Sequence, residues 1–424
     1  MTLPSPDTRI LDCVDLEDLA EVRSLVENGA SLDTRDCEGW TALMAAAAWG
    51  LVDFIVVLAD NGASIDVARE DTGATSIFVA AQNGDHEIVR VLADKGANLD
   101  LATEDGFTPV WMAAQNGHHE VVRVLAGKGA NLDLARTNGS SPVFAAARNG
   151  RHEVVRLLAE NGADINRADN YEQSPAFVAA EYGHREALRV LVENDADINR
   201  AKHGQSPAFV AAKNSHVEVL RLLVDNNADI NRADAFGYTP AYMAAWKGHL
   251  EVLRLLHRSK ARLHEPTRTG WTAMHAAASE GNLDIVYYLA RHGADLARRA
   301  DDGRSALDQA GRRGQTTTVT LLEEVQSAGG WRDYIARLRL PYCLIRHEVS
   351  RTGLVCPANE DEPGQQGLYH FVFGAGDEVV AAALLRAAPD DVFAVIGSFL
   401  GVRLVDEDKV DDSDDSDDSR GSDY

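Results

Sequence analysis

Apolar and polar positions follow one another along this chain in blocks that recur about every 33 residues. In the block that begins at Gly106, two apolar stretches, Pro109–Ala114 and Val121–Leu125, are separated by the polar run Gln115–Glu120. Each stretch is long enough for about two helical turns, and its apolar residues have helical spacing. A single pair of such helices cannot bury its apolar face, so the pattern predicts helix pairs that stack on neighbouring pairs.

A glycine marks the same place in nearly every block, with spacings of 34, 33, 33, 33, 32, 33, 33 and 33 residues. Thr or Ser follows two residues later, mostly with Pro behind it, and a pair of alanines lies five to six residues beyond the hydroxyl. A fixed period of this length indicates a repeat architecture. The slots hold Gly39, Gly73, Gly106, Gly139, Glu172, Gly204, Gly237, Gly270 and Gly303.

This register resembles the ankyrin repeat, and the unit from Gly106 to Asp133 matches it best. The resemblance implies an all-α solenoid of helix-turn-helix units joined by hairpins. Each hydroxyl can cap a first helix, and the proline after it has a preset φ. Small pairs such as Ala113 and Ala114 allow the close helix packing that stacking needs. The expected caps are Thr108, Ser141, Ser174, Ser206 and Thr239.

The register divides the chain into four parts. Residues 1–35 form a degenerate N-terminal capping repeat, in which Glu17 takes the place of the mid-repeat glycine, and residues 36–326 hold nine repeats. Residues 327–405 leave the register, and we expect a mainly helical subdomain that caps the array or recruits a second factor. Residues 406–424 contain ten acids against two bases, so we expect a disordered acidic tail.

The formal net charge of −25 argues against nucleic acid or an anionic membrane as the main partner. No apolar run approaches the roughly 20 residues that span a bilayer, and the first residues lack the pattern of a signal peptide. Four scattered cysteines favour a reducing compartment. We therefore expect a monomer in the cytoplasm, with the nucleus as a second compartment left open, and a protein as its partner.

The catalytic and metal-binding motifs that the sequence suggests are incomplete. His119-Glu120 and His152-Glu153 match the first half of a zinc-protease helix, but an arginine stands where each second histidine is needed. Gly127-Lys128-Gly129 lacks the spaced glycine and the Ser or Thr of a phosphate-binding loop. We expect no catalytic residue, metal or cofactor, and hence no enzyme.

The ankyrin resemblance also implies where a partner binds, because hairpin tips and the exposed side of the first helices form one concave surface in that family. Exposed aromatics on a rigid surface are suited to binding hot spots. The alternative is that some of these rings pack along neighbouring hairpins. The slot after the turn glycine and the mid-repeat slots hold the candidates Trp40, Trp49, Phe107, Tyr182, Tyr238, Trp246 and Trp271.

A second aromatic set replaces the histidine of the family's Thr-Pro-Leu-His motif, which survives only at His275. One ring per repeat suits packing through the seam between repeats better than contact with a ligand. These residues are Phe78, Trp111, Phe144, Phe177, Phe209 and Tyr242.

Two kinds of modification are suggested. Asn166, Asn199 and Asn231 lie in Asp-Ile-Asn sequences that resemble the context of asparaginyl hydroxylases, while the simpler interpretation is that each Asn bonds its own turn. Ser413, Ser416 and Ser419 lie among aspartates, a setting that favours acid-directed kinases.

One junction breaks the turn pattern. Lys260 occupies a slot that favours Gly or Asn at the end of a second helix, and the hairpin after it contains Pro266. We expect a weak interface between repeats there, with backbone strain at Lys260.

These features favour a scaffold or adaptor that holds a protein on the concave face. The alternative is a substrate receptor of a ubiquitin ligase, since Ala388–Leu400 resembles the opening helix of an F-box, although it has Ala388 where Leu is usual. Some ankyrin arrays end in a SOCS box, but Cys343 lacks the leucine four residues earlier. Regulation of an enzyme by occlusion is a third possibility that the sequence does not separate from scaffolding.

Overall fold

The structure, a computed structural model, describes residues 6–337, and for residues 6–8 the backbone alone. Within this range the regular segments are α-helices, apart from an isolated bridge between Lys202 and Gln205. The predicted all-α architecture is therefore confirmed. The described residues divide into two compact units, one of residues 6–285 and 297–315 and the other of residues 286–296 and 316–337. The acidic tail and most of the predicted C-terminal subdomain lie outside the described residues.

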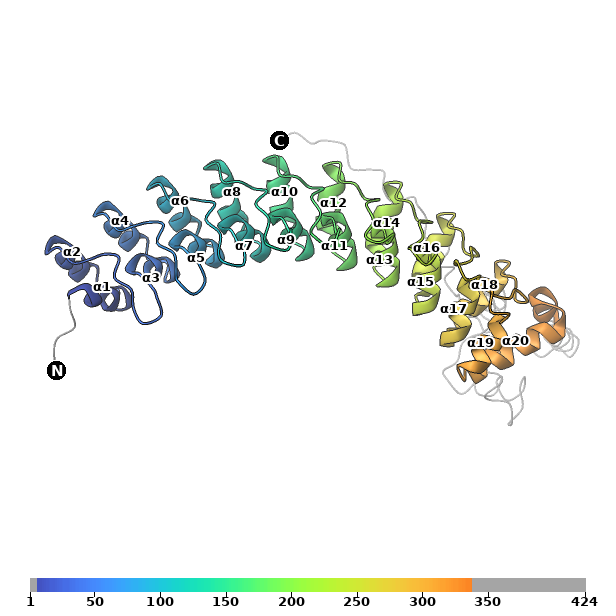
Figure 1. Cartoon of the computed structure of the whole chain (residues 1–424). Helices are drawn as coiled ribbons and strands as arrows, with labels where there is room; N and C mark the ends of the chain where they lie inside the picture. The colour runs from blue at the N-terminus through green and yellow to red at the C-terminus, as the bar shows by residue number, and fades with distance from the viewer. Residues whose placement is uncertain (1–5, 338–424) are drawn as a thin grey trace, which may run out of the picture. The chain divides into compact units, whose positions relative to one another are not determined.

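Helices in the first unit form two rows (Figure 1), because each first helix packs against the first helices of the neighbouring repeats and each second helix against second helices. The first helices are α1 (Pro6–Asp15), α3 (Ala42–Ala48), α5 (Ser76–Asn83), α7 (Pro109–Asn116), α9 (Pro142–Arg148), α11 (Pro175–Glu181), α13 (Pro207–Lys213), α15 (Pro240–Lys247), α17 (Ala273–Glu280) and α19 (Ala306–Arg312). The second helices are α2 (Leu19–Glu27), α4 (Val52–Asp60), α6 (His86–Asp94), α8 (His119–Gly127), α10 (His152–Glu160), α12 (Arg185–Glu193), α14 (Val217–Asp225) and α16 (Leu250–Arg258). Two further second helices complete the series. α18 (Leu283–Arg291) begins in the first unit and continues into the second, and α20 (Thr316–Ala328) belongs to the second unit.

Hydroxyl caps begin the first helices, as the sequence predicts. Thr108 Oγ1 accepts the Trp111 N–H at 3.2 Å, and Pro109 occupies the first helical position. Such a cap stabilises a helix by about 1 kcal/mol. The same arrangement is found at the other four predicted caps, Ser141, Ser174, Ser206 and Thr239.

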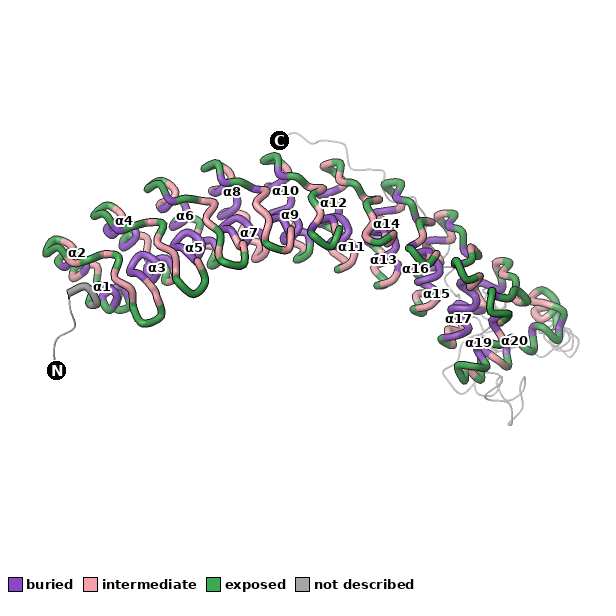
Figure 2. The backbone as a smooth tube through the Cα atoms, in the orientation of Figure 1, coloured by how far each residue is buried: buried purple, intermediate pink, exposed green. Residues whose placement is uncertain are grey.

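The core lies where the two helix rows meet. Ala113 and Ala114 are fully buried in α7, and Val122 and Leu125 are fully buried in α8. Figure 2 colours each residue by its burial and shows buried residues along the helices and intermediate or exposed residues in the turns that join them. Because the alanine side chains are so short, successive first helices approach closely enough to exclude water from this seam.

The hairpin loop between repeats, called a finger below, needs its glycine for two reasons. Gly106 has φ +84°, which a residue with a side chain rarely adopts. A Cβ at Gly106 would also lie 2.9 Å from the backbone nitrogen of Thr137 in the next finger. The glycine slot therefore combines a left-handed turn with a close approach between repeats.

One finger is shorter than the others, which explains the single spacing of 32 residues. Most fingers close between residues four apart, as where Thr103 N donates to Phe107 O at 2.9 Å. Lys202 and Gln205, three apart, instead exchange both backbone hydrogen bonds, at 3.0 and 2.8 Å, across a turn in which His203 and Gly204 have positive φ. This is the two-residue turn of a tight hairpin.

A set of side-chain bonds locks each repeat to the one before it, and the sequence analysis did not foresee it. His118 Nε2 lies 3.0 Å from Gln82 O, and because a carbonyl can only accept, Nε2 carries the proton. A Cβ at Gly84 would lie 2.6 Å from this ring, so the glycine makes room for the histidine. The same contact recurs at His184, His216 and His249, with Nε2 to carbonyl distances of 3.0–3.1 Å.

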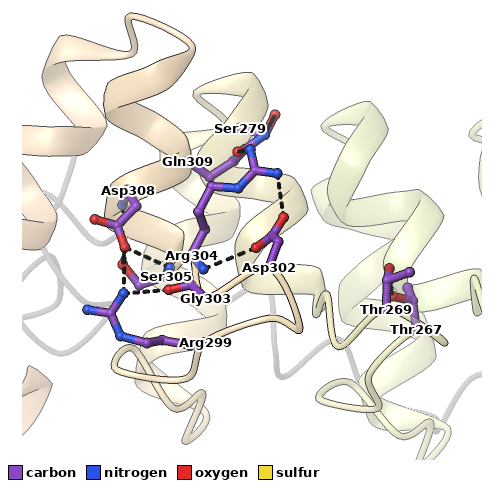
Figure 3. A network of polar contacts seen from close by, with 10 residues as sticks. All are labelled: Thr267, Thr269, Ser279, Arg299, Asp302, Gly303, Arg304, Ser305, Asp308 and Gln309. Atoms are coloured by element: carbon purple, nitrogen blue, oxygen red, sulfur yellow. Dashed lines mark hydrogen bonds and ion pairs between the residues drawn. The ribbon is translucent and has the colours of Figure 1, made fainter.

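The last repeat replaces apolar contacts with polar ones (Figure 3). Asp308 stands where most earlier repeats have Phe, Trp or Tyr, and its carboxylate accepts from the Ser305 N–H at 2.9 Å and from Arg299 at 3.0 Å. Gln309 bonds the hydroxyl of Ser279, in α17, at 3.4 Å, and Arg304 at 3.1 Å. This network holds α19 without the ring that packs the other seams.

In the second unit, aromatic contacts join α18 to the segment after α20. Residues 331–337 are helical, and the ring centroids of Trp331 and Tyr287 are 5.2 Å apart. Tyr334 Oη donates to Glu324 Oε2 at 3.1 Å. The chain after α20 therefore packs on the second helix of the preceding repeat within this unit.

Lys260 adopts the strained conformation that its position predicts. Its φ is +64°, and its N–H donates to His257 O at 2.9 Å, which closes the turn after α16. Asp195 and Asn227 fill the same slot in the two repeats before it, with φ of +64° and +62°. Bonds to the preceding repeat persist at this junction: Arg262 N donates to Asn231 Oδ1 at 2.8 Å, and Arg268 N donates to Phe236 O at 3.2 Å.

Candidate protein-binding surface

Each finger presents the residue after its turn glycine in a fixed position. Tyr238 shows the arrangement: its N–H donates to Asp234 Oδ1 and its carbonyl accepts from Asp234 N, both at 2.9 Å. Trp40 is held by Asp36 in the same way. The backbone beneath these rings is therefore ordered before any partner arrives, so little backbone entropy is lost on binding.

The structure places none of the seven predicted binding aromatics in the core. Trp49, with 67% of its surface exposed, and Tyr182, with 47%, are fully displayed. The other five, Trp40, Phe107, Tyr238, Trp246 and Trp271, are half-buried. Only Tyr238 and Trp246 come together among the seven, with ring centroids 6.0 Å apart. Trp40 and Trp49 belong to one repeat, and Phe107, Tyr182 and Trp271 each belong to a different one.

Basic side chains cover most of these rings. The Arg136 guanidinium lies 4.2 Å from the centroid of Phe107, and Arg304 lies 5.2 Å from that of Trp271. In both pairs the arginine comes from the repeat after the ring, and Arg69 covers Trp40 in the same way at 4.8 Å. Such contacts are worth about 0.5–1 kcal/mol at exposed sites. Trp40, Phe107 and Trp271 therefore pack against the next hairpin on one side, as the alternative to partner binding expects, while part of each ring stays exposed.

Tyr238 belongs instead to an aromatic cluster. Its ring stacks on Tyr242, with centroids 4.7 Å apart, and Phe236 lies 5.9 Å away on the same finger. Trp246 closes the cluster and donates its Nε1–H to Glu280 Oε1 at 3.1 Å. Burial raises the pKa of Tyr242, with smaller contributions from Tyr238 and Glu280, so its hydroxyl stays neutral. The result is an aromatic centre on the fingers and first helices of this part of the array, with the Glu280 carboxylate at its edge.

Two exposed aromatics were missed. Tyr171 and Phe236 lie directly before the turn-glycine slot and expose 61% and 67% of their surface. The sequence analysis considered only the slot after the glycine and the mid-repeat slots. The repeat register would have found both residues if the tip of each finger had been included.

The second aromatic set is buried, which confirms its interpretation as packing. Phe177 and Phe209 each expose 1% of their surface, and the other four, Phe78, Trp111, Phe144 and Tyr242, expose 3–8%. His275, the one histidine left at this position of the repeat, bonds backbone, since its Nδ1 accepts from Thr272 N at 3.2 Å. Burial lowers the pKa of His275 below its ordinary value.

The expectation that the Asp-Ile-Asn asparagines bond their own turns is wrong. Asn166 Oδ1 accepts the N–H of Asp197 in the next repeat at 2.8 Å, while its own N–H donates to Asp164 Oδ1. The same bond runs from Asn199 to Asp229 N and from Asn231 to Arg262 N. Asp100 and Asp133 accept from the next repeat in the same way. These side chains tie successive hairpins together, and their hydroxylation stays a prediction.

Residues 6–337 also bear on metal binding, disulfides and membrane-spanning helices. No group of three or more His, Cys, Asp or Glu side chains there could hold a metal ion. Cys13 is buried and Cys37 exposed, and neither forms a disulfide. No helix between residues 6 and 337 has the length and apolar character needed to cross a membrane.

Comparison with known proteins identifies the repeats. A family model described as ankyrin repeats (3 copies) matches residues 66–136, 128–202 and 257–327. A second, described as ankyrin repeats (many copies), matches residues 10–59 and 208–257. The chain therefore belongs to the ankyrin-repeat family, whose members are in general scaffolds for protein interaction.

Comparison with individual proteins adds less. The search of curated proteins finds no significant match. Among solved structures, the crystal structure of the human ASB11 ankyrin repeat domain is similar, with 28% sequence identity and a TM-score of 0.48. That alignment covers 51% of this chain and 98% of the ASB11 domain.

Proposed function

We propose that this chain is an adaptor that holds a partner protein against the fingers and first helices of its ankyrin array. The observation that carries the proposal is the row of exposed aromatics on that face, above all Trp49, Tyr171, Tyr182 and Phe236. Large aromatic side chains exposed on a soluble surface favour binding, because they desolvate much area and lose little side-chain entropy. The adaptor acts in the cytoplasm as a monomer.

Rigidity of the array supports this role. Each repeat is tied to the next by side-chain bonds such as His184 to Arg148 O and Asn166 to Asp197 N. A surface ordered in advance loses less entropy when it binds than one that must fold around its partner. Recognition by this face therefore needs no rearrangement of the helices.

Affinity capture tests the proposal. The full chain is compared with a variant in which Tyr171, Tyr182 and Phe236 are replaced by Ser, because these exposed rings contribute least to the fold. Hot-spot aromatics commonly contribute about 2 kcal/mol each, so the variant should lose its partners while its melting temperature stays within about 2 °C. A second variant, Tyr238→Ala with Trp246→Ala and Trp271→Ala, tests the half-buried rings. Unchanged capture by both variants would remove this face as the binding site.

The ligase alternative depends on residues 388–400, which lie outside the described residues. Capture with the full chain and with a version truncated after Gln326 separates the two functions. Cullin-adaptor proteins that disappear on truncation would favour a substrate receptor. If the same proteins bind both versions, the array alone carries the interaction, and an assay of any captured enzyme then tests regulation by occlusion.

A further inference from the structure

The repeats around the shortened finger differ from the rest of the array. The finger that closes between Lys202 and Gln205 lies between two full-length fingers, whose tips carry Tyr171 and Phe236. Together with Trp49, these two residues are the most exposed aromatics of the described chain. The adjoining first helices add two more rings, since Tyr182 follows α11 directly and Trp246 lies in the last turn of α15. With Tyr238, five aromatic side chains therefore lie on the same face of three successive repeats.

Basic side chains accompany these rings. Arg148 lies 5.5 Å from the ring centroid of Tyr182, Lys202 5.9 Å from that of Tyr171, and Lys247 5.7 Å from that of Trp246. Lys213 ends α13, between the repeats of Tyr182 and Trp246. Within the described residues, none of these four cations forms an ion pair with a carboxylate. We call the five rings and four cations the aromatic-basic surface.

The four cations differ from the basic residues on the second helices of the same repeats. The chain has a formal net charge of −25, and basic residues on the second helices of the same repeats do pair with acids. Arg189 pairs with Glu186 at 3.2 Å and Arg221 with Glu218 at 3.7 Å. Four carboxylates belong to the same fingers and first helices, so they equal the four cations in number. Asp169 and Asp234 are buried and accept backbone N–H groups of their own fingers. Glu181 lies 3.4 Å from the Gln173 amide and Glu172 is exposed, so none of the four is engaged with the cations that cover the rings.

The geometry points to a specific kind of partner. We infer that the aromatic-basic surface binds an extended segment of another protein in which carboxylates flank an aromatic or large aliphatic side chain. This inference rests on the proposed adaptor function and assigns the chemistry of its partner. A cation held over a ring loses less side-chain freedom on binding a carboxylate, and the ring edges stay available to an apolar side chain. Opposite charge also speeds the encounter.

A peptide probe tests the inference with the full chain. The probe is a fluorescein-labelled synthetic peptide of 12 residues, in which glutamates flank two central phenylalanines, and binding is followed by fluorescence anisotropy. One comparison peptide has lysines in place of the glutamates, and another has serines in place of the phenylalanines. We expect the glutamate peptide to bind at least about tenfold more tightly than the lysine peptide, and less tightly as salt rises. The serine peptide should also bind more weakly.

Charge reversal on the protein locates the site. Lys213→Glu combined with Lys247→Glu should weaken the glutamate peptide about tenfold. The control, Arg221→Glu, changes an exposed base on α14 of the same repeat as Lys213 and should leave binding unchanged. Equal melting temperatures of the three proteins show that the substitutions act on binding and not on folding.

Several results would overturn the assignment. These are equal affinity for the glutamate and lysine peptides, no binding of the glutamate peptide at about 1 mM, or a double variant that binds like the wild type. A version of the chain that ends after Val405 tests whether the acidic tail binds this surface. If it binds the probe more than tenfold more tightly than the full chain does, the tail is the natural occupant of the surface, and the assignment to a segment of another protein is wrong. Partners that resist the charge reversal but are lost on replacing Tyr171, Tyr182 and Phe236 would leave the adaptor function standing without acidic recognition.

Discussion

Lys260 offers a direct test of how backbone conformation sets the stability of this array. The residue has φ +64° in the turn after α16, where most other repeats place a glycine and two place Asp195 and Asn227. Gly129 is the matched position, with φ +84° and nothing within 4 Å of where a Cβ would lie. The slot therefore demands a left-handed backbone without restricting the size of the side chain. Within the described residues the Lys260 side chain forms no ion pair, so replacing it removes only the Cβ and an exposed chain.

The magnitude follows from two opposing contributions. A residue with a Cβ loses about 1–2 kcal/mol in the left-handed conformation. Glycine loses about 0.5–1 kcal/mol more conformational entropy on folding than other residues. The difference predicts that Lys260→Gly stabilises the protein by about 0.5–1 kcal/mol. Gly129→Lys should destabilise it by a similar amount, because no atom blocks the new side chain.

Urea denaturation followed by circular dichroism and tryptophan fluorescence measures both variants. Because a repeat array can unfold in parts, the two signals are fitted separately before free energies are compared. Hydrogen exchange adds a local measurement, and amides near residues 256 to 268 should exchange fastest in the wild type and more slowly in Lys260→Gly. A destabilised glycine variant, or uniform protection across this junction, would refute the argument that the turn is strained and the interface weak.

Four further outcomes are expected. Gly106→Ala should lower the free energy of unfolding in urea more than Gly129→Ala does, since of these two positions only at Gly106 would the new Cβ lie close to the next finger, 2.9 Å from a backbone nitrogen. Equal losses would show that neighbouring fingers move apart without a cost in free energy. Asn199→Ala should lose about 1 kcal/mol with the bond to Asp229 N, whereas Asn199→Asp keeps an acceptor and should lose less. Burial lowers the pKa of His275, so the unfolded chain binds a proton at this residue more readily than the folded chain does. The stability that neutral His275 contributes is therefore present above pH 6.5 and is lost as the pH falls towards the folded pKa. The melting temperature of His275→Gln should depend less on pH in this range, and an unchanged dependence would exclude His275 as the cause of the pH effect. Mass spectrometry of the native protein should detect phosphate on serines in the tail, each adding about −1.5 to −2 charge, and their constant absence would leave the tail without this regulation. Those serines are Ser413, Ser416 and Ser419.

Features that depend on neighbouring residues were predictable from the sequence. The first helices begin where a hydroxyl precedes Pro or Ala, because the cap bonds an N–H only three residues away, as Thr108 does with Trp111. The positive φ of Lys260 followed from its place after an apolar helical run. Burial of the ring set represented by Phe177 followed from the period, since one position per repeat meets the same surroundings each time.

The tertiary structure decided the contacts between repeats. Asn166 and Asp197 are 31 residues apart, and His184 and Arg148 are 36 apart, so neither pair is visible in the pattern of one repeat. Which side chain meets which across a seam depends on the rise and twist between repeats, and residue order does not contain these quantities. The covering of Phe107 by Arg136, in the next repeat, has the same origin. The sequence alone thus determined where helices begin and which faces are apolar, while stacking decided which displayed side chains stay free for a partner.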